Sequence, residues 1–118
     1  MNKRIKQKYG RRYRRKKIYN LCDYLARDIC TNLKLYEHIT PAVPSCFCHP
    51  YDDCKEEKWL EAREKWHTVL RNMIWSFDEI AKNYPNKPND DPQEIAAYWK
   101  RVDNGLRLFV DYFTSLWF

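Results

Sequence analysis

Hydrophobic side chains recur every three or four residues in three long stretches of the chain, which is the spacing of one face of an α-helix. The first stretch ends before Pro41 and the second before Pro85, and proline ends a helix because it lacks an amide hydrogen and restricts the preceding residue. The pattern therefore predicts helices over about 18–39, 54–84 and 92–117. The positions that carry it are Ile18, Leu21, Cys22, Leu25, Ile29, Leu33 and Tyr36; Trp59, Ala62, Trp66, Val69, Leu70, Met73, Phe77, Ile80 and Tyr84; and Ile95, Trp99, Val102, Leu106, Phe109, Phe113 and Leu116.

Capping signals mark the starts of the second and third predicted helices. Asp53 followed by Glu56 has the spacing of a capping box, in which both side chains bind free backbone amides of the first turn. Asp91 and Glu94 repeat this spacing, and Pro92 lies at the first helical position, where a missing amide hydrogen costs nothing. These signals predict where both helices begin.

Three amphipathic helices with short connections predict an all-α fold, a small antiparallel helical bundle. The domain organisation that follows is an N-terminal arm over 1–17 and a single helical domain over 18–118. Gly105 interrupts no periodicity, so we expect it to lie in mid-helix and to permit close backbone approach. An aromatic stripe is expected in the core rather than around a cofactor: Trp59, Trp66, Phe77, Trp99, Phe109 and Phe113.

The net charge of +6 is distributed unevenly along the 118 residues. Ten of the 22 lysines and arginines lie in 1–17, which contains no acidic residue, so the rest of the chain holds 12 basic and 16 acidic side chains. The protein is therefore a mildly acidic body with a strongly basic arm.

The arm is the strongest predicted functional feature. Arginine binds phosphate in a bidentate manner and tyrosine rings stack on bases, which together predict binding of an anionic nucleotide or a nucleic acid. The alternative is a solvated tail that only aids solubility. The predicted ligand-binding residues are Lys3, Arg4, Lys8, Tyr9, Arg11, Arg12, Tyr13, Arg14, Arg15, Lys16 and Lys17.

Four residues with metal-binding side chains lie within nine positions of the proline-rich segment that follows the first predicted helix. Cys46, Cys48, His49 and Cys54 offer the four nitrogen and sulfur ligands that structural zinc prefers, although the Cys-x-Cys-His spacing is tighter than usual. One of the cysteines of the first helix is an alternative ligand. The other interpretation is three ordinary thiols and a surface histidine, so zinc is the only cofactor the sequence offers.

Several classes of protein are disfavoured by composition. The chain has two glycines, too few for a phosphate-binding loop, a dinucleotide fingerprint or a nucleophile elbow, and no catalytic constellation has local support, so we expect no enzyme. The basic start is not followed by an apolar segment, and no predicted helix is uniformly apolar. With five cysteines and no visible secretion signal, we expect a protein of the cytoplasm without a membrane segment.

The second and third predicted helices resemble a pattern found in small uncharacterised bacteriophage proteins. The resemblance rests on the string 73–80 preceded by Trp66 and Leu70, on the closing segment 105–117, and on the opening residues 1–6. It covers roughly the first ten residues and 59–118. The family brings no established activity or catalytic residues, so the resemblance implies a phage origin and, by analogy with other small phage proteins, a counter-defence role.

Taken together, the sequence predicts a non-enzymatic binding protein whose ligand is a signalling nucleotide or a nucleic acid. The alternatives are an inhibitor that binds a host defence protein, as anti-CRISPR proteins do, and a structural accessory of the phage particle. The apolar residues near the end of the chain favour a homo-oligomer slightly: Phe113, Leu116, Trp117 and Phe118.

Overall fold

The computed structural model describes residues 20–40, 42–44, 46–47 and 56–116. This part of the chain is all-α and contains no strand, so the predicted fold class, a small helical bundle, is confirmed. None of its helices is both long and apolar enough to cross a membrane. The elements are α2 (Leu21–Ile39), α3 (Glu56–Ala81), α4 (Pro92–Tyr112) and the short 3₁₀-helix η1 (Phe113–Ser115).

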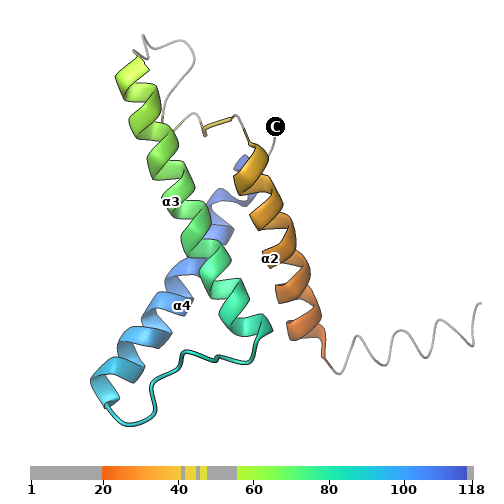
Figure 1. Cartoon of the computed structure of the whole chain (residues 1–118), viewed down its shortest axis with the longest axis vertical. Coiled ribbons are helices and arrows are strands. Elements are labelled where there is room, and N and C mark those ends of the chain that lie inside the picture. The colour runs from red at the N-terminus through yellow and green to blue at the C-terminus, as the bar shows by residue number, and fades with distance from the viewer. Residues whose placement is uncertain (1–19, 41, 45, 48–55, 117–118) are drawn as a thin grey trace, which may run out of the picture.

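The longest helix, α3, is the centre of the arrangement, and the other two helices pack on it (Figure 1). Helix α2 runs antiparallel to α3, whereas α4 crosses behind α3 at a steep angle. No backbone contact joins α2 to α4 within the described residues; near the end of α2 the Tyr36 hydroxyl donates a 3.5 Å hydrogen bond to the Ser115 carbonyl. The bundle therefore has two helix–helix interfaces, both of which belong to α3.

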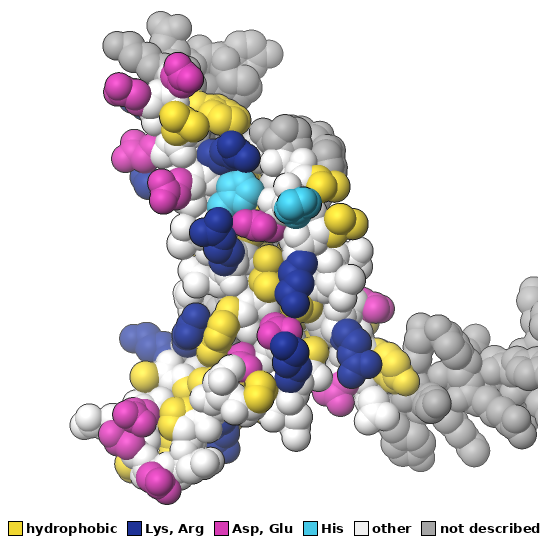
Figure 2. All heavy atoms as spheres, in the orientation of Figure 1, with side chains coloured by type: hydrophobic (Ala, Val, Ile, Leu, Met, Phe, Trp, Pro, Cys, Tyr) yellow, Lys and Arg dark blue, Asp and Glu magenta, His cyan; other side chains and the backbone are white. Residues whose placement is uncertain are grey.

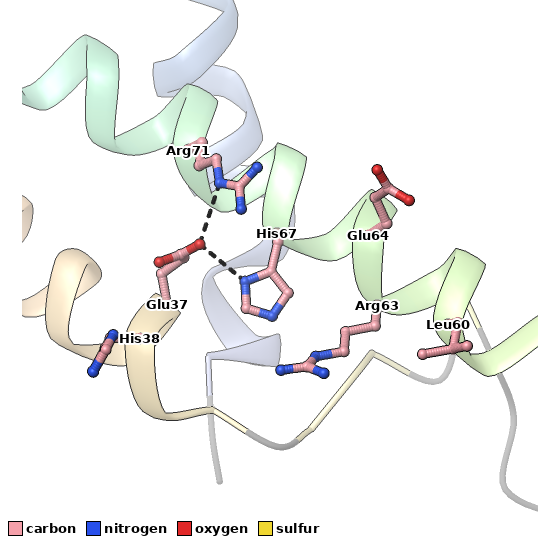
Figure 3. A pocket seen from close by; sticks show the side chains of 7 residues that line it. All are labelled: Glu37, His38, Leu60, Arg63, Glu64, His67 and Arg71. Carbon is pink, nitrogen blue, oxygen red and sulfur yellow. Dashed lines mark hydrogen bonds and ion pairs between the residues drawn. The ribbon is translucent and has the colours of Figure 1, made fainter. Parts of the chain in front are cut away.

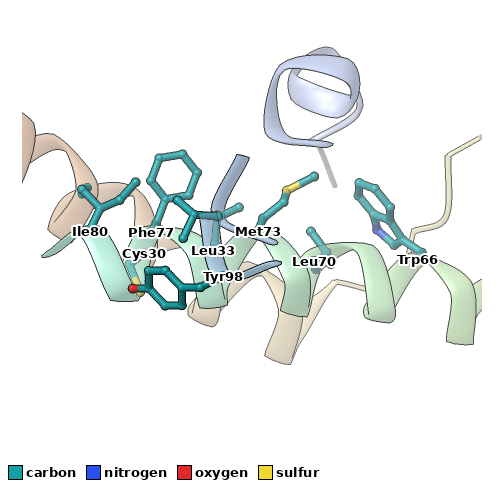
Figure 4. Packing of buried hydrophobic residues seen from close by; sticks show 10 residues of the cluster. Cys30, Leu33, Trp66, Leu70, Met73, Phe77, Ile80 and Tyr98 are labelled. Carbon is teal, nitrogen blue, oxygen red and sulfur yellow. The ribbon is translucent and has the colours of Figure 1, made fainter. Parts of the chain in front are cut away.

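The core consists of one face of α3 and of the side chains that α2 and α4 lay on it (Figure 4). Burial of each large apolar side chain stabilises the fold by about 1.5–3 kcal/mol. The predicted inner face of α3 is confirmed over about four turns by Trp66, Leu70, Met73, Phe77 and Ile80, all buried. Their partners are Ala26, Cys30 and Leu33 from α2, and Tyr98 and Val102 from α4.

The predicted inner face of α2 is wrong in its first two turns. Leu21 and Leu25 are 46% and 50% exposed, and Ala26 and Cys30 are buried in their place. The hydrophobic pattern of α2 is broad enough to contain two stripes, and α3 packs on the one with the smaller side chains. Small residues let the two helix axes come closer than a pair of leucines would. The second stripe is left on the surface.

The predicted inner face of α4 is confirmed at Val102, with Leu106 and Phe109 packed against the core, and is wrong at one position near its start. Tyr98 is buried, and Trp99, which was expected in the core, is 38% exposed. The reason is polar: the Tyr98 hydroxyl donates a 3.3 Å hydrogen bond to Oε1 of Glu79, a carboxylate that is itself only 1% exposed. The aromatic stripe is therefore only partly core, since Trp59 and Phe113 are 36% and 59% exposed as well.

Gly105 lies where α4 crosses α3, as predicted. A Cβ atom added at this position would lie 2.6 Å from the Asn72 carbonyl oxygen and would overlap the Ser76 side chain. Ser76 is fully buried and its hydroxyl donates a 3.3 Å hydrogen bond to the Arg101 carbonyl, so it has no room to move away. The close crossing of these two helices therefore depends on a residue without a side chain.

Helix α3 ends three residues before the predicted position. The amide of Tyr84 donates to the Glu79 carbonyl at 2.7 Å and the amide of Asn83 donates to the Ile80 carbonyl at 3.2 Å. This paired arrangement is a Schellman motif, which closes a helix with a left-handed residue. Asn83 and Tyr84 both adopt it, at φ 60° and 59°. The prediction followed the hydrophobic pattern to Tyr84, whereas the helical backbone ends at Ala81.

The cap of α4 is confirmed, because the Asp91 side chain accepts a 2.9 Å hydrogen bond from the Gln93 amide and Pro92 begins the helix. Its end is earlier than predicted, at Tyr112, where the tighter turn of η1 takes over. The cap predicted at Asp53 lies outside the described residues.

Candidate functional site

Most of the site residues predicted from the sequence lie outside the described part of the chain. This is true of the whole arm over 1–17, and of Cys48, His49 and Cys54 in the predicted zinc site. Cys46 is described and carries an exposed, free thiol. Both the arm and the zinc site therefore stay predictions.

The alternative zinc ligands on α2 lie in different surroundings. Cys22 is exposed, whereas Cys30 is buried between α2 and α3, with its sulfur 3.8 Å from both the Ile74 carbonyl oxygen and Oδ1 of Asp78. Burial raises the pKa of the Cys30 thiol, which disfavours the thiolate that zinc requires. Within the described residues no three histidine, cysteine or acidic side chains are grouped as metal ligands.

A polar hollow of about 510 Å³ lies between the last turns of α2 and the first half of α3 (Figure 3). It is open to solvent, and most of its side chains are charged. We call it the polar hollow; it is lined by Glu37, His38, Leu60, Arg63, Glu64, His67 and Arg71.

One carboxylate organises the hollow. Oε1 of Glu37 accepts hydrogen bonds from Nδ1 of His67 at 3.0 Å and from Nε of Arg71 at 3.3 Å. The Glu37 and His67 side chains are largely buried, at 22% and 15% exposed, while the Arg71 side chain is 69% exposed. Glu37 therefore fixes the positions of both basic groups and leaves the outer nitrogens of the Arg71 guanidinium facing solvent.

Three basic side chains form a row along α3. Arg63, His67 and Arg71 are four residues apart, and residues at this spacing lie on the same helix face. Within the described residues no carboxylate pairs with Arg63; its guanidinium lies instead over the Trp59 ring, 5.7 Å from the ring centroid. The row presents guanidinium groups at both ends and an imidazole between them.

A second charged cluster continues the same boundary between α2 and α3. Asp78 lies between two lysines: Oδ1 is 3.7 Å from Nζ of Lys34 and Oδ2 is 3.0 Å from Nζ of Lys82. Figure 2 shows basic side chains spread over this face, with acidic and histidine side chains between them. We call the whole boundary, with both clusters, the α2–α3 seam. Each of its clusters joins one carboxylate to two basic groups. Glu64 also lines the polar hollow, so the seam holds three carboxylates beside four lysines and arginines and two histidines.

Sequence reasoning missed the seam. It gave no functional role to Arg63, His67, Arg71 or Glu37. A signal was present, namely basic residues repeated every four positions on the polar face of the second predicted helix. The partner carboxylate was not foreseeable from sequence, because Glu37 comes from another helix, 30 residues earlier than His67.

The chemistry that this arrangement offers is the binding of an anion. Guanidinium groups donate hydrogen bonds to phosphate or carboxylate oxygens, and the hollow gives such a group room to enter. Nε2 of His67 adds a donor only as an imidazolium, because Nδ1 already donates to Glu37. Comparison of the chain with protein-family models, with curated proteins and with solved structures finds no match.

Proposed function

We propose that this chain is a binding protein for a phosphate-bearing ligand, a nucleotide or a nucleic acid, which it holds on the α2–α3 seam. The observation that carries the proposal is the row of Arg63, His67 and Arg71 beside an open hollow of about 510 Å³. Charged hydrogen bonds from arginine to phosphate are among the strongest that a protein surface forms.

The unengaged arginine donors of the seam favour an anion over a cation, although Glu64 also lines the polar hollow. Glu37 is engaged by two basic groups, and Oε1 accepts from both of them. Arg63 has no carboxylate partner among the described residues, and Arg71 uses only Nε for its bond to Glu37. Five donors are available on each guanidinium, so both arginines keep free donors for phosphate oxygens.

An aromatic ring adjoins the basic row. Trp59 is 36% exposed and lies under the Arg63 guanidinium. An exposed tryptophan next to a phosphate-binding arginine is typical of surfaces that stack a base while they hold its phosphate. This neighbour favours a nucleotide over a simple inorganic anion.

The basic arm adds long-range attraction to the proposal. Ten cations among residues 1–17 attract polyanions from a distance, and their contacts make affinity depend on salt. If about six phosphates are neutralised in all, the slope of log affinity against log salt is about −4 to −5. The setting that we propose is counter-defence by a cytoplasmic phage protein, which rests on the sequence resemblance, and the working form is a homo-oligomer.

The proposal is tested by fluorescence anisotropy of the full chain with two probes, a labelled single-stranded oligodeoxynucleotide and a labelled nucleoside triphosphate. The double variant Arg63→Ala/Arg71→Ala is expected to bind at least one probe about tenfold more weakly or worse. The matched control Lys58→Ala/Lys65→Ala removes the same charge from the opposite face of α3, where both lysines are exposed, and is expected to change affinity less than about threefold.

Equal losses in the two double variants would show that only overall charge matters and would contradict a site on the seam. A chain without residues 1–17 separates the contribution of the arm: equal affinity with and without these residues would remove the arm from the proposal. Failure of the unaltered chain to bind either probe would contradict the proposed function as a whole. A protein target in the host would then be the better hypothesis.

A further inference from the structure

The outer face of α2 carries a second hydrophobic stripe that α3 does not cover. Its four apolar side chains are 46–58% exposed, and two polar residues lie between them. The stripe advances in steps of four and three residues, the spacing of a helix seam that packs on another helix. We call it the α2 stripe; its residues are Leu21, Leu25, Asp28, Asn32, Leu35 and Ile39.

The surroundings of the stripe extend its apolar surface. A hollow of about 330 Å³ runs alongside it, where α2 and α4 fail to meet, and Figure 2 shows hydrophobic side chains near both ends of the outer edge of α2. Its lining is mainly apolar, and it shares Asp28 and Asn32 with the stripe; the other lining residues are Ile29, Leu33, Tyr36, Phe109 and Leu116. An uncovered surface of this kind marks an interaction site.

The order of residues in the stripe is symmetric about its centre. Two apolar residues, two polar residues and two apolar residues follow one another, so the order is the same in both directions. A second copy laid antiparallel on the stripe therefore places Leu21 against Ile39, Leu25 against Leu35 and Asp28 against Asn32. Each of these pairs occurs twice, as a two-fold axis between identical chains requires.

We propose that the α2 stripe is a self-association surface, on which a second copy of this chain packs with its own α2 antiparallel. The polar pair fixes the direction. In the antiparallel arrangement the Asp28 carboxylate faces the amide of Asn32 of the second copy. The Asn32 amide donates one hydrogen to the Asp28 carbonyl of its own helix at 2.8 Å and keeps a second hydrogen for the partner.

Asp28 also disfavours the parallel arrangement. It would bring Asp28 of one copy against Asp28 of the other, and facing like charges destabilise a helix seam. The basic arm is unsuited to cover the stripe, because ten of its 17 residues are cationic. A second copy supplies leucines to cover the exposed leucines of the stripe and an amide to face Asp28.

This interface leaves the proposed ligand site open. At roughly 100° of rotation per residue, Glu37 lies on the opposite side of α2 from Leu21 and Ile39. A dimer therefore carries two α2–α3 seams that both face solvent. The proposal does not depend on the identity of the ligand, and its test uses no ligand.

The first measurement is sedimentation of the full chain over a wide range of concentration. The unaltered protein is expected to form a dimer. Leu25→Glu is expected to raise its dissociation constant about a hundredfold or more, because in a symmetric dimer the substitution occurs at two places in the interface. Leu60→Glu is the matched control, since Leu60 is 51% exposed on α3, and it is expected to leave the dimer intact. Circular dichroism checks that both variants fold.

The second measurement tests the direction of the helices by mixing two defective variants. Leu25→Glu and Leu35→Lys are each expected to be largely monomeric. An equal mixture is expected to recover a heterodimer, because an antiparallel pair sets the introduced carboxylate of one variant against the introduced ammonium group of the other. A parallel pair never joins these two positions. A mixture that stays monomeric, an unaltered chain that is monomeric throughout, or a dimer that survives Leu25→Glu would each overturn the proposal.

Discussion

The two faces of α3 differ in how they hold their neighbours. On one side, α4 crosses at Gly105 so closely that a single added carbon would overlap Ser76 and the Asn72 backbone. On the other side, α2 packs through the buried small residues Ala26 and Cys30, and exposed charged side chains flank this contact. The first interface is tight and intolerant of change, whereas the charged part of the second tolerates change. The close crossing fixes α3 against α4, and the exposed charges of the other interface are where we propose that a ligand binds.

Polar groups play opposite parts in the two interfaces. At the crossing with α4, Glu79 and Tyr98 are both buried and are joined by a hydrogen bond, so replacing either one leaves a buried polar group without its partner and destabilises the fold. In the seam, Arg71, Lys34 and Lys82 have side chains that are 69%, 57% and 61% exposed. Exposed ion pairs of this kind contribute about 0–1 kcal/mol each. Their positions are therefore available for recognition, because stability hardly depends on them.

The largest expected effect comes from Gly105→Ala. Alanine is the better helix former by about 1 kcal/mol, but its Cβ would meet the Asn72 carbonyl oxygen at 2.6 Å and overlap Ser76. Backbone atoms of α3 cannot move away cheaply, so we expect a net loss of about 3 kcal/mol in the free energy of unfolding, measured by urea denaturation.

Asn104→Ala provides the control, since Asn104 is the exposed neighbour of Gly105 on the same helix. Alanine there should change the free energy of unfolding by less than about 1 kcal/mol, in the stabilising direction. If Gly105→Ala also stabilises the protein, the two helices do not approach as closely as described, and the contrast between the two faces of α3 disappears.

A smaller effect is expected from Tyr98→Phe, which removes the hydroxyl that donates to the buried Glu79 carboxylate. Loss of a hydrogen bond to a buried charged group costs about 2 kcal/mol at neutral pH. Burial, together with the charge of Glu79, raises the pKa of Tyr98 to about 12. Between pH 10 and about 12 the folded chain therefore keeps a proton that the unfolded chain has lost, and stability falls as the pH rises.

The loss of stability at high pH can be assigned to the Tyr98–Glu79 pair by comparing variants. The unaltered protein is expected to lose about 2–3 kcal/mol between these two pH values through Tyr98, and Tyr98→Phe should lose less by that amount in urea titrations at each pH. Tyr24→Phe, a tyrosine on α2 away from Glu79, should behave as the unaltered protein does. An identical alkaline slope for all three chains would show that the Tyr98 hydroxyl is not held as described.

Helix positions were predictable from the sequence because they depend on local patterns. The stop before Pro41 and the cap at Asp91 were both predicted, and so was the role of Gly105. The side chains that the first turns of α2 and α4 place against α3 were not predictable, since they depend on contacts with another helix. Leu25 and Trp99 were assigned to the core by their hydrophobicity and lie on the surface instead.

The candidate site was harder to predict for the same reason. A sequence displays the basic row of α3, but it does not display the carboxylate that reaches the row from α2. Glu37 pairs with His67 only because Ala26 and Cys30, and not the leucines, face α3 and so turn Glu37 toward the row. The choice of stripe thus decides two things together, namely which side chains form the α2–α3 seam and which apolar side chains of α2 stay exposed.

The smallest expected effect on stability belongs to Glu37→Gln, although it changes the centre of the polar hollow. Glutamine keeps the shape of the side chain and an oxygen that accepts the hydrogen bond from His67. The ion pair that is lost with Arg71 involves a side chain that is 69% exposed, so the free energy of unfolding should fall by less than about 1 kcal/mol. Removing the negative charge should strengthen binding of the labelled oligodeoxynucleotide about two- to tenfold, measured by anisotropy at constant salt. A destabilisation as large as that of Gly105→Ala would show that the seam is a structural interface like the crossing. Weaker binding of the probe would contradict this expectation and would show that Glu37 contributes more by holding His67 and Arg71 in position than it costs by its negative charge.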